Sequence, residues 1–267
     1  MSAAPRAALG RPPALLPAPA VVAAVFLVVP LAALVLDTPW SDLWSLLGTS
    51  EVREALRLSA LTSGLTVLIC LAVGTPLAWL LARVDFPGRS VLRALVVVPL
   101  VLPPVVAGVA LSSALGRNGL IGAAIRDVTG YTIPFTTTAV VIAHAFVAMP
   151  FFVLAVEGAF RSTGAGYDAV AATLGASRWT TFRRITLPLA LPGLLAGCAL
   201  AWARSLGEFG ATITFAGNFP GSTQTMPSLI YTELQGDVAV ARTLSLILLL
   251  VSVIVLGALR ERWLHVP

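Results

Sequence analysis

Arg204 and Glu208 are the two residues whose types and spacing first suggest chemistry in this chain. Both are charged, and both lie inside a run of mostly apolar residues, 190–215. Residues four positions apart share one face of a helix, so the guanidinium and the carboxylate are predicted to form an ion pair. Charges in such a run usually face a cavity or a partner. The pair is therefore either part of a gate or a fixed contact between helices, and the sequence leaves both interpretations open.

The residues that most often act as nucleophiles, metal ligands or amine catalysts are few and scattered. Lys is absent, which excludes a phosphate-binding P-loop and a Schiff-base enzyme, so any ATP hydrolysis must be done by another chain. His144 and His265 form no metal-binding motif, and we interpret His144 as a polar residue in helix packing in preference to a proton relay. Cys70 and Cys198 lie in apolar runs and are interpreted as small buried hydrophobes. We expect no catalytic residue, no metal site and no cofactor.

The composition of the chain places these residues in a membrane. Of 267 residues, 58% are hydrophobic and only 11% are charged, against about 25% charged residues in soluble domains. A helix needs roughly 20 apolar residues to cross a bilayer. Six runs are long enough, and they predict an all-α integral membrane protein with one transmembrane domain, 1–267. The predicted spans are approximately 18–36, 58–82, 94–115, 136–158, 190–215 and 241–259.

Arginine placement predicts the orientation of the spans, because basic residues are enriched in cytoplasmic loops. With both termini in the cytoplasm, eleven of the seventeen arginines are on the cytoplasmic side. The net charge of +5 then reflects orientation, and no nucleic-acid binding is needed to explain it. Segment 41–57 is too polar to cross and is predicted to be an outside amphipathic helix leading into the second span. Stretch 14–36 exceeds the roughly 7–15 apolar residues of a secretory signal core, so we expect it to be a span.

The loop between the fourth and fifth spans, 160–189, is predicted to be cytoplasmic and partly helical. Tyr167–Leu174 has a helical composition, and Gly175 supplies a left-handed or tight turn at its end. Ser177 can cap a second short helix, which we expect to stop before Pro188. Two short helices around a glycine turn would form a compact knob that fits a groove in a soluble partner. An ordinary basic loop has the same composition and remains the alternative.

The spacing in this loop resembles the coupling loop of ABC-importer permeases, the membrane subunits that dock a separate ATPase. Gly175 is followed, after nine residues, by Ile185-Thr186-Leu187-Pro188, and an Ala-rich helical segment precedes it. The resemblance implies a type I ABC-importer permease architecture. It also implies an ATPase-coupling role for Asp168, Ala171, Gly175, Ala176, Ile185, Leu187 and Pro188. The match departs at its start, where the family often has Glu and this chain has Ala169, with the acid displaced to Asp168.

A second stretch, WARSLGEFGATITFAGNFPGSTQTMPSLIY at 202–231, resembles molybdate-type ABC permeases, as does PLVLPPVVAG at 99–108. The resemblance implies import of molybdate by alternating access, with no catalysis by this chain. It implies a permease homodimer in the bacterial plasma membrane, surrounded by membrane lipid. The implied partners are two ATPase subunits and an extracytoplasmic molybdate-binding protein. Sulfate, thiosulfate and tungstate remain alternative cargoes, because these dianions differ little in shape.

A set of residues on the third and fifth spans is interpreted as the translocation pathway or its gate. Glycines allow close helix approach, and threonine hydroxyls offer an oxyanion weak contacts without a fixed charge. Adjacent prolines interrupt a helix, which is tolerated at membrane depth where the helix lines a cavity or packs on protein. The candidates are Arg204, Gly207, Glu208, Gly210, Thr212, Thr214, Pro103 and Pro104. For the third span, a role in packing alone remains an alternative.

Two other classes of protein are the alternatives to an ATP-driven importer. An intramembrane enzyme would need a nucleophile–base set or metal ligands at membrane depth, and two isolated histidines and two isolated cysteines do not supply one. A proton-driven secondary transporter could use Glu208 and His144, and it would need no coupling loop.

Overall fold

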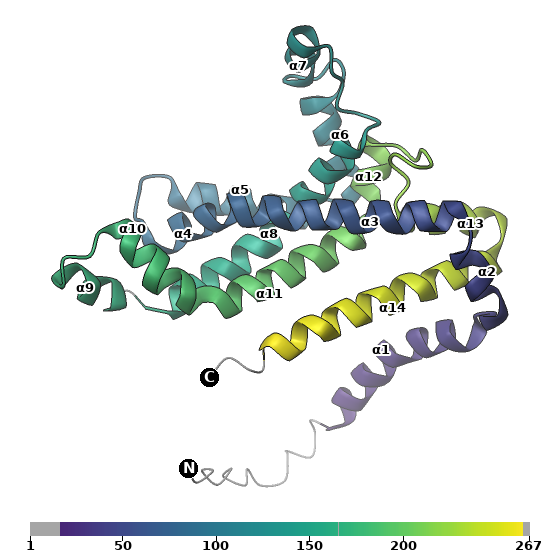
Figure 1. Ribbon diagram of the computed structural model, residues 1–267, viewed down its shortest axis with the longest axis horizontal. Helices are drawn as coiled ribbons and strands as arrows, with labels where there is room; N and C mark the ends of the chain where they lie inside the picture. The colour runs from purple at the N-terminus through teal and green to yellow at the C-terminus, as the bar shows by residue number, and fades with distance from the viewer. Residues whose placement is uncertain (1–16, 165, 264–267) are drawn as a thin grey trace.

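The computed structural model describes residues 17–164 and 166–263, and every regular element in these ranges is a helix (Figure 1). The α-helices are α1 Pro17–Asp37, α2 Leu43–Leu47, α3 Ser50–Ile69, α4 Thr75–Arg83, α5 Arg89–Val101, α6 Pro104–Leu115, α7 Gly122–Thr129, α8 Thr137–Ser162, α9 Gly166–Thr173, α10 Arg178–Thr181, α11 Leu187–Leu206, α12 Gly210–Phe215, α13 Met226–Gly236 and α14 Val238–Trp263. A 3-10 turn spans Trp40–Asp42, and two π-helical turns span Cys70–Gly74 and Phe182–Thr186. The predicted all-α fold is confirmed for this part of the chain. The terminal residues, His265 among them, lie outside the described residues.

The long helices run roughly side by side, and α8 lies at the centre of their packing (Figure 1). α8 packs most extensively against α11, and also against α3, α4 and α5. Phe152 and Phe160 of α8 are fully buried in the core that it shares with α4 and α11. α9 and α10 lie at one end of the bundle, and α2 and α13 at the other, whereas α6 and α7 rise away from its long axis.

Five helical segments in the described residues are long and apolar enough to cross a membrane. They are Pro17–Asp37, Ser50–Arg83, Thr137–Ser162, Arg178–Leu206 and Val238–Gly257. A sixth is added if the bent pair α5 and α6 is taken as one span. The segments overlap all six predicted runs. They extend beyond several of the predicted boundaries, because helix continues into the polar residues at either end of a run.

The third predicted span, 94–115, is not one straight helix. The helix direction bends by 119° between α5 and α6, which lie on either side of Leu102 and Pro103. A proline restricts the preceding residue to extended backbone, and Leu102 has φ −66° and ψ 131°. Pro103 precedes a second proline and is also non-helical, with ψ 138°, so the helix restarts at Pro104 in a new direction.

The fifth predicted span, 190–215, is wrong at both ends. α11 stops at Leu206, and Gly207–Phe209 leave the helical conformation before α12 begins. At the other end, the helix that starts at Arg178 continues through Pro188, where we expected it to stop. The π turn just before α11 loosens the row of carbonyls that a proline ring would otherwise meet. A π turn likewise precedes Pro76 in α4, so both helices pass a proline by the same device.

The predicted outside helix 41–57 is interrupted. α2 ends at Leu47, and Thr49 caps α3 by accepting a hydrogen bond from the amide of Val52. α3 then continues without a break into the second apolar run. Polar residues 50–57 are therefore the first turns of the membrane-spanning helix, and α2 alone is a separate element.

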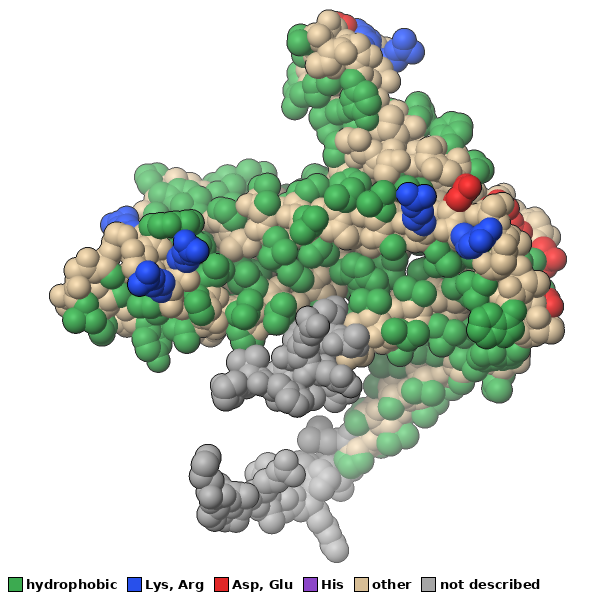
Figure 2. Space-filling model, viewed as in Figure 1, with side chains coloured by type: hydrophobic (Ala, Val, Ile, Leu, Met, Phe, Trp, Pro, Cys, Tyr) green, Lys and Arg blue, Asp and Glu red, His purple; other side chains and the backbone are tan. Residues whose placement is uncertain are grey.

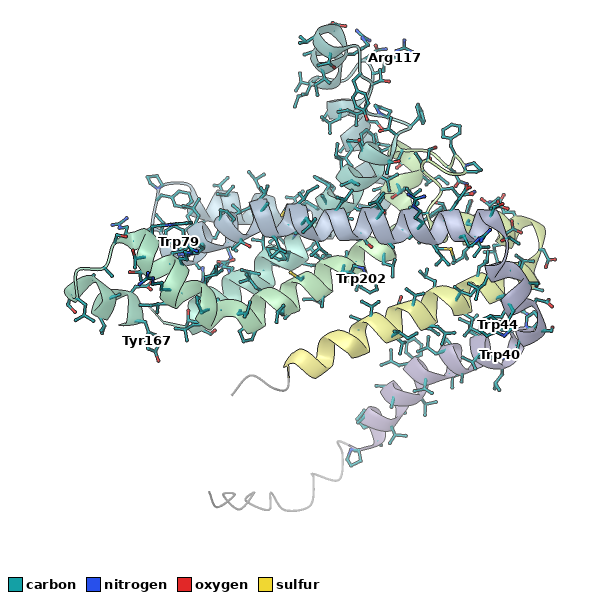
Figure 3. The ribbon with its side chains drawn as sticks, in the orientation of Figure 1. Trp40, Trp44, Trp79, Arg117, Tyr167 and Trp202 are labelled. Atoms are coloured by element: carbon teal, nitrogen blue, oxygen red, sulfur yellow. The ribbon has the colours of Figure 1, made fainter. Side chains whose placement is uncertain are left out.

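The surface of the bundle has the character of a membrane protein. α1 has no buried residue, and its valines, leucines and Phe26 are exposed except for Leu34 and Val35, which are half-buried near its end. Hydrophobic side chains cover most of the visible face, with basic residues near the α9–α10 end and both acidic and basic ones near the α13 end (Figure 2). Trp40 and Trp44 lie at one end of the bundle, and Trp79 and Tyr167 at the other (Figure 3). Aromatic side chains at both ends are typical of the two membrane–water interfaces.

Candidate functional site

The predicted turn of the coupling loop is present at Gly175. Its φ is +77°, in the left-handed region that favours glycine. The amides of Gly175 and Ala176 donate to the carbonyls of Ala172 and Ala171, which ends α9 in a Schellman motif. Ser177 then caps α10 by accepting a hydrogen bond from the amide of Thr180 at 3.2 Å. Both local predictions for this loop are confirmed.

The knob built by α9 and α10 exposes large apolar side chains at its tip. Leu174 is 82% exposed and Trp179 is 68% exposed, and Tyr167 and Val170 are also exposed. Such side chains at the polar end of a membrane protein are typical of a surface that docks another protein. Of the other predicted coupling residues, Gly175 and Pro188 are exposed, Ala176, Ile185 and Leu187 are half-buried, and Ala171 is buried.

Asp168 faces the protein and not the tip of the knob. One of its carboxylate oxygens accepts a hydrogen bond from the hydroxyl of Thr186 at 3.0 Å, and the other lies 3.6 Å from the guanidinium of Arg83. Arg83 in turn donates to the hydroxyl of Thr163 at 2.9 Å. These contacts tie α9 to the end of α4, to the end of α8 and to the π turn that precedes α11.

A cluster of aromatic rings packs between the knob and helices α4 and α8, and the sequence did not predict it. Phe182 in the π turn packs edge-on against Trp79 of α4, with ring centroids 5.9 Å apart, and stacks on Trp179 of α10 at 5.7 Å. Phe160 of α8 completes the cluster at 6.3 Å from Phe182. Local sequence gives no sign of the contacts of Arg83, because its partners lie 80 or more residues away in sequence.

The ion pair between Arg204 and Glu208 is present as predicted. The two side chains are 2.6 Å apart, and the side chain of Glu208 is only 1% exposed. The other carboxylate oxygen of Glu208 accepts a hydrogen bond from the amide of Ala211 at 2.7 Å. Glu208 therefore joins the last turn of α11 to the first turn of α12 across the break in the helix. A carboxylate at a helix N-terminus is also favoured by the helix dipole.

His144 is buried on α8 beside the same break. Its Nδ1 lies 2.9 Å from the hydroxyl of Ser205, the residue after Arg204. Its Nε2 has no hydrogen-bond partner among the described residues. The imidazole thus links α8 to the last turn of α11, which supports the packing interpretation.

α6 packs closely on α12, and this brings several predicted pathway residues together. A Cβ on Gly210 would lie 2.5 Å from Pro104, and a Cβ on Gly108 would lie 1.7 Å from the hydroxyl of Thr214. Only glycine fits at either position without movement of the neighbouring helix. Thr214 donates its hydroxyl hydrogen to the carbonyl of Gly210.

The remaining pathway candidates differ in burial and do not share one contact. Thr212 is fully buried, and its hydroxyl has no partner among the described residues. Gly207 is exposed at the break itself, and Pro103 is exposed at the bend before α6. The structure therefore brings Pro104, Gly210 and Thr214 into one contact, with Arg204 and Glu208 beside it.

Residues 74–265 match the family model described as the binding-protein-dependent transport system inner membrane component. That range covers the coupling loop, the α11–α12 segment with its break at Gly207–Phe209, and most of the bundle. The chain belongs to this family. As a transport component it is a multi-pass inner-membrane protein.

Similar proteins support the family membership of this transport component. The molybdenum transport system permease protein ModB of Mycobacterium tuberculosis is 47% identical over 89% of each chain. The protein of that name from Escherichia coli K12 is 43% identical over 81% of this chain and 94% of its own. The E. coli sulfate transport system permease protein CysT is 34% identical over 87% of this chain and 85% of its own.

Solved structures share the fold of this transport component. A bacterial ABC transporter involved in the import of alginate matches with a TM-score of 0.74 over 95% of this chain and 94% of that chain. The MetNI methionine ABC transporter matches with a TM-score of 0.60 over 85% of this chain and 98% of that chain. The sequence identities are 18% and 19%, so these matches bear on the fold alone.

Proposed function

We propose that this transport component is the permease subunit of an ATP-driven importer of molybdate. The observation that carries the proposal is the graded similarity to named relatives. The two molybdenum permeases are 47% and 43% identical to this chain, whereas the sulfate permease is 34% identical. Sulfate is the second candidate cargo, because that relative also matches over most of both chains.

The proposed assembly is a homodimer of this permease with two ATPase subunits and an extracytoplasmic binding protein. The exposed apolar tip of the knob supports an ATPase partner, since Leu174 and Trp179 would otherwise remain in water. The chain itself has no lysine for a phosphate-binding loop, so the partner hydrolyses ATP.

The proposed topology has six spans with both termini in the cytoplasm. α1 ends, and α14 starts, at the α13 end of the bundle, so the other end of each helix points toward the α9 side (Figure 1). The basic residues Arg83, Arg161 and Arg178 are at the same end, as the positive-inside rule requires. The broken pair α5 and α6 supplies the sixth crossing.

The proposed mechanism is mechanical coupling through one helix. Arg178–Leu206 is continuous from the knob to the break at Glu208, a length of 29 residues, or about 43 Å at the rise of an α-helix. Closure of the ATPase pair displaces the knob, and this rod carries the displacement to the Arg204–Glu208 pair. α8 moves with the rod, because it packs along α11. The break between α11 and α12 then opens or closes the path for the oxyanion.

ATP hydrolysis by the assembled complex tests this function. We expect molybdate-loaded binding protein to stimulate hydrolysis by the permease–ATPase complex in lipid nanodiscs, and sulfate-loaded protein to stimulate it far less. Equal stimulation by both would support sulfate as a cargo. The absence of stimulation by either would contradict an ATP-driven oxyanion importer.

A further inference from the structure

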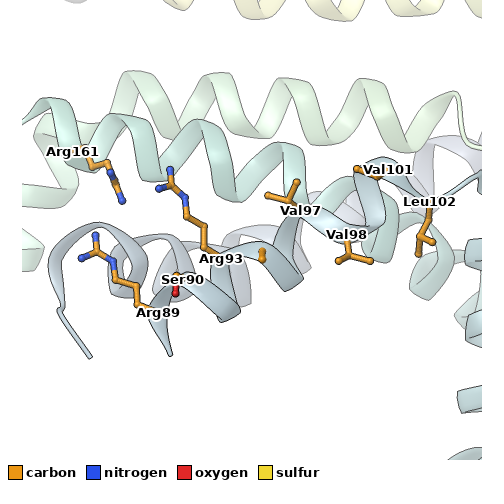
Figure 4. Close-up of a pocket in the computed structure, with 9 residues that line it drawn as sticks. Arg89, Ser90, Arg93, Val97, Val98, Val101, Leu102 and Arg161 are labelled. Carbon is orange, nitrogen blue, oxygen red and sulfur yellow. The ribbon is translucent and has the colours of Figure 1, made fainter. Parts of the chain in front are cut away.

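A groove along α5 combines a basic end with an apolar wall. Its cavity has a volume of about 940 Å³. The lining residues are Arg89, Ser90, Arg93, Ala94, Val97, Val98 and Val101 of α5, Leu102 directly after it, and Arg161 of α8. The three arginines gather at one end, and the valines and Leu102 continue toward the bend before α6 (Figure 4). None of these residues belongs to the coupling loop or to the break between α11 and α12.

The sequence of α5 produces this division by helical spacing. Arg89, Arg93, Val97 and Val101 are four residues apart, so they form one stripe along the helix. The stripe is basic over its first two turns and aliphatic over the next two. From Arg89 to Leu102 it extends about 20 Å, whereas one leaflet of the hydrocarbon core is about 15 Å thick.

The three arginines are held in place by ion pairs, and each guanidinium keeps some N–H donors free. Glu157 is buried on α8, and its carboxylate pairs with Arg161 at 2.8 Å and with Arg93 at 3.5 Å. Arg89 pairs with Asp85 and donates to the carbonyl of Leu81. A guanidinium has five N–H donors, so each of the three retains donors that these contacts do not use. Three guanidinium groups and two carboxylates leave a net positive charge at this end.

We propose that this groove binds an anionic phospholipid of the inner leaflet. The phosphate lies among Arg89, Arg93 and Arg161, and one acyl chain follows the wall made by Val97, Val98, Val101 and Leu102. A free oxyanion would use only the basic end of the groove. A second copy of this chain related by a two-fold axis would face arginine with arginine, which is unfavourable without further acids. This site is separate from the proposed transport function. It rests on that proposal only in one respect, because the proposed topology is what places the groove in the inner leaflet.

Lipid retention by the purified permease–ATPase complex tests the site without any transport measurement. Native mass spectrometry after delipidation and titration with phosphatidylglycerol or phosphatidylcholine measures retained lipid. We expect phosphatidylglycerol to be retained in preference to phosphatidylcholine. Arg93→Gln and Arg161→Gln should each weaken phosphatidylglycerol binding by about five- to tenfold. Arg93→Lys should restore part of the loss, and Arg117→Gln, on the arm that carries α7, should change nothing (Figure 3).

A variant that fills the groove distinguishes bound lipid from other occupants. Val98→Trp keeps every charge and blocks the path of the acyl chain, so we expect it to lower phosphatidylglycerol retention as strongly as Arg93→Gln does. Retention that is unchanged in Val98→Trp, together with displacement of lipid by excess sodium molybdate, would show a free-oxyanion site and overturn the proposal. Disulfide formation between two Val98→Cys copies in native membranes would overturn it in favour of a dimer contact.

Discussion

At the scale of the residue, Glu208 is the side chain that joins α11 to α12 across the break between them. It is buried, paired with Arg204 and hydrogen-bonded to the amide of Ala211. A buried carboxylate with two partners is favourable only while both remain. Any displacement of α11 relative to α12 must therefore strain or break one of these two contacts, which is the property expected of a gate.

Glu208→Gln should loosen this link without leaving a cavity. The amide keeps the shape of the side chain but loses the charge–charge interaction with Arg204, at a cost of about 1–3 kcal/mol in the free energy of unfolding. We expect raised ATP hydrolysis by the complex in the absence of binding protein. Glu233→Gln on α13, which has no ion pair among the described residues, is the matched control. Wild-type hydrolysis and stability in Glu208→Gln would reduce the pair to an ordinary helix contact.

Asp168 makes contacts that its predicted ATPase-coupling role did not indicate. Its carboxylate pairs with Arg83 and accepts a hydrogen bond from Thr186, both within the chain. Local sequence could not predict the contact between Asp168 and Arg83, because Arg83 lies on α4, 85 positions away. Burial and partner choice at this distance depend on how α4, α8 and α9 pack.

A double-mutant cycle measures what the Asp168–Arg83 contact contributes to coupling. Asp168→Asn and Arg83→Gln should each lower the stimulation of ATP hydrolysis by loaded binding protein, and the double variant should be little worse than either alone. The pair is part-exposed, so its contribution to stability is small, about 0.5–1 kcal/mol. Strictly additive losses would show that the two residues act separately. Asp127→Asn on α7 serves as the control.

At the scale of the element, long apolar runs predicted the membrane helices well, and breaks within them were predicted unevenly. The bend between α5 and α6 follows from two adjacent prolines, which are visible in the sequence. The break at Gly207–Phe209 contains no proline and depends on Glu208 capping α12 and on α6 packing against it. The passage through Pro188 depends on a π turn, and no residue pattern indicated one.

Gly175 gives the most direct prediction at the level of the coupling loop. Valine strongly disfavours a φ of +77°, so Gly175→Val should strain or unwind the turn by about 1–3 kcal/mol. We expect a protein that inserts and folds but no longer couples ATP hydrolysis to uptake. Gly166→Val is the matched control in the same loop, because nothing lies within 4 Å of its Cβ position. Normal coupled uptake by Gly175→Val would contradict the role of the turn.

The contact between α6 and α12 gives a prediction about packing. Gly108→Ala should destabilise the protein by about 1–3 kcal/mol, because its Cβ would overlap the hydroxyl of Thr214 and approach the carbonyl of Ala211. Thr214→Ala should be tolerated alone and should recover part of the loss in the double variant. Thermal unfolding of the purified protein measures all three. No recovery in the double variant would mean that α6 does not rest on α12 in this way.

At the scale of the whole molecule, the proposed topology places the knob and the arm that carries α7 on opposite sides of the membrane. Leu174 and Val128 are both strongly exposed, so cysteines at these positions should react readily. In a background without Cys70 and Cys198, Leu174→Cys should be labelled only from the cytoplasm and Val128→Cys only from outside. Labelling of both from the same side would contradict the six-span arrangement.

The central claim is that ATP hydrolysis by a partner drives molybdate through this chain. The most direct measurement is uptake of molybdate into proteoliposomes that contain the permease, its ATPase and its binding protein. We predict uptake that requires ATP, resists excess sulfate and is lost in Gly175→Val. Uptake that continues without ATP hydrolysis and collapses with a proton ionophore would contradict the account, because the rod from α10 to Glu208 would then have nothing to transmit.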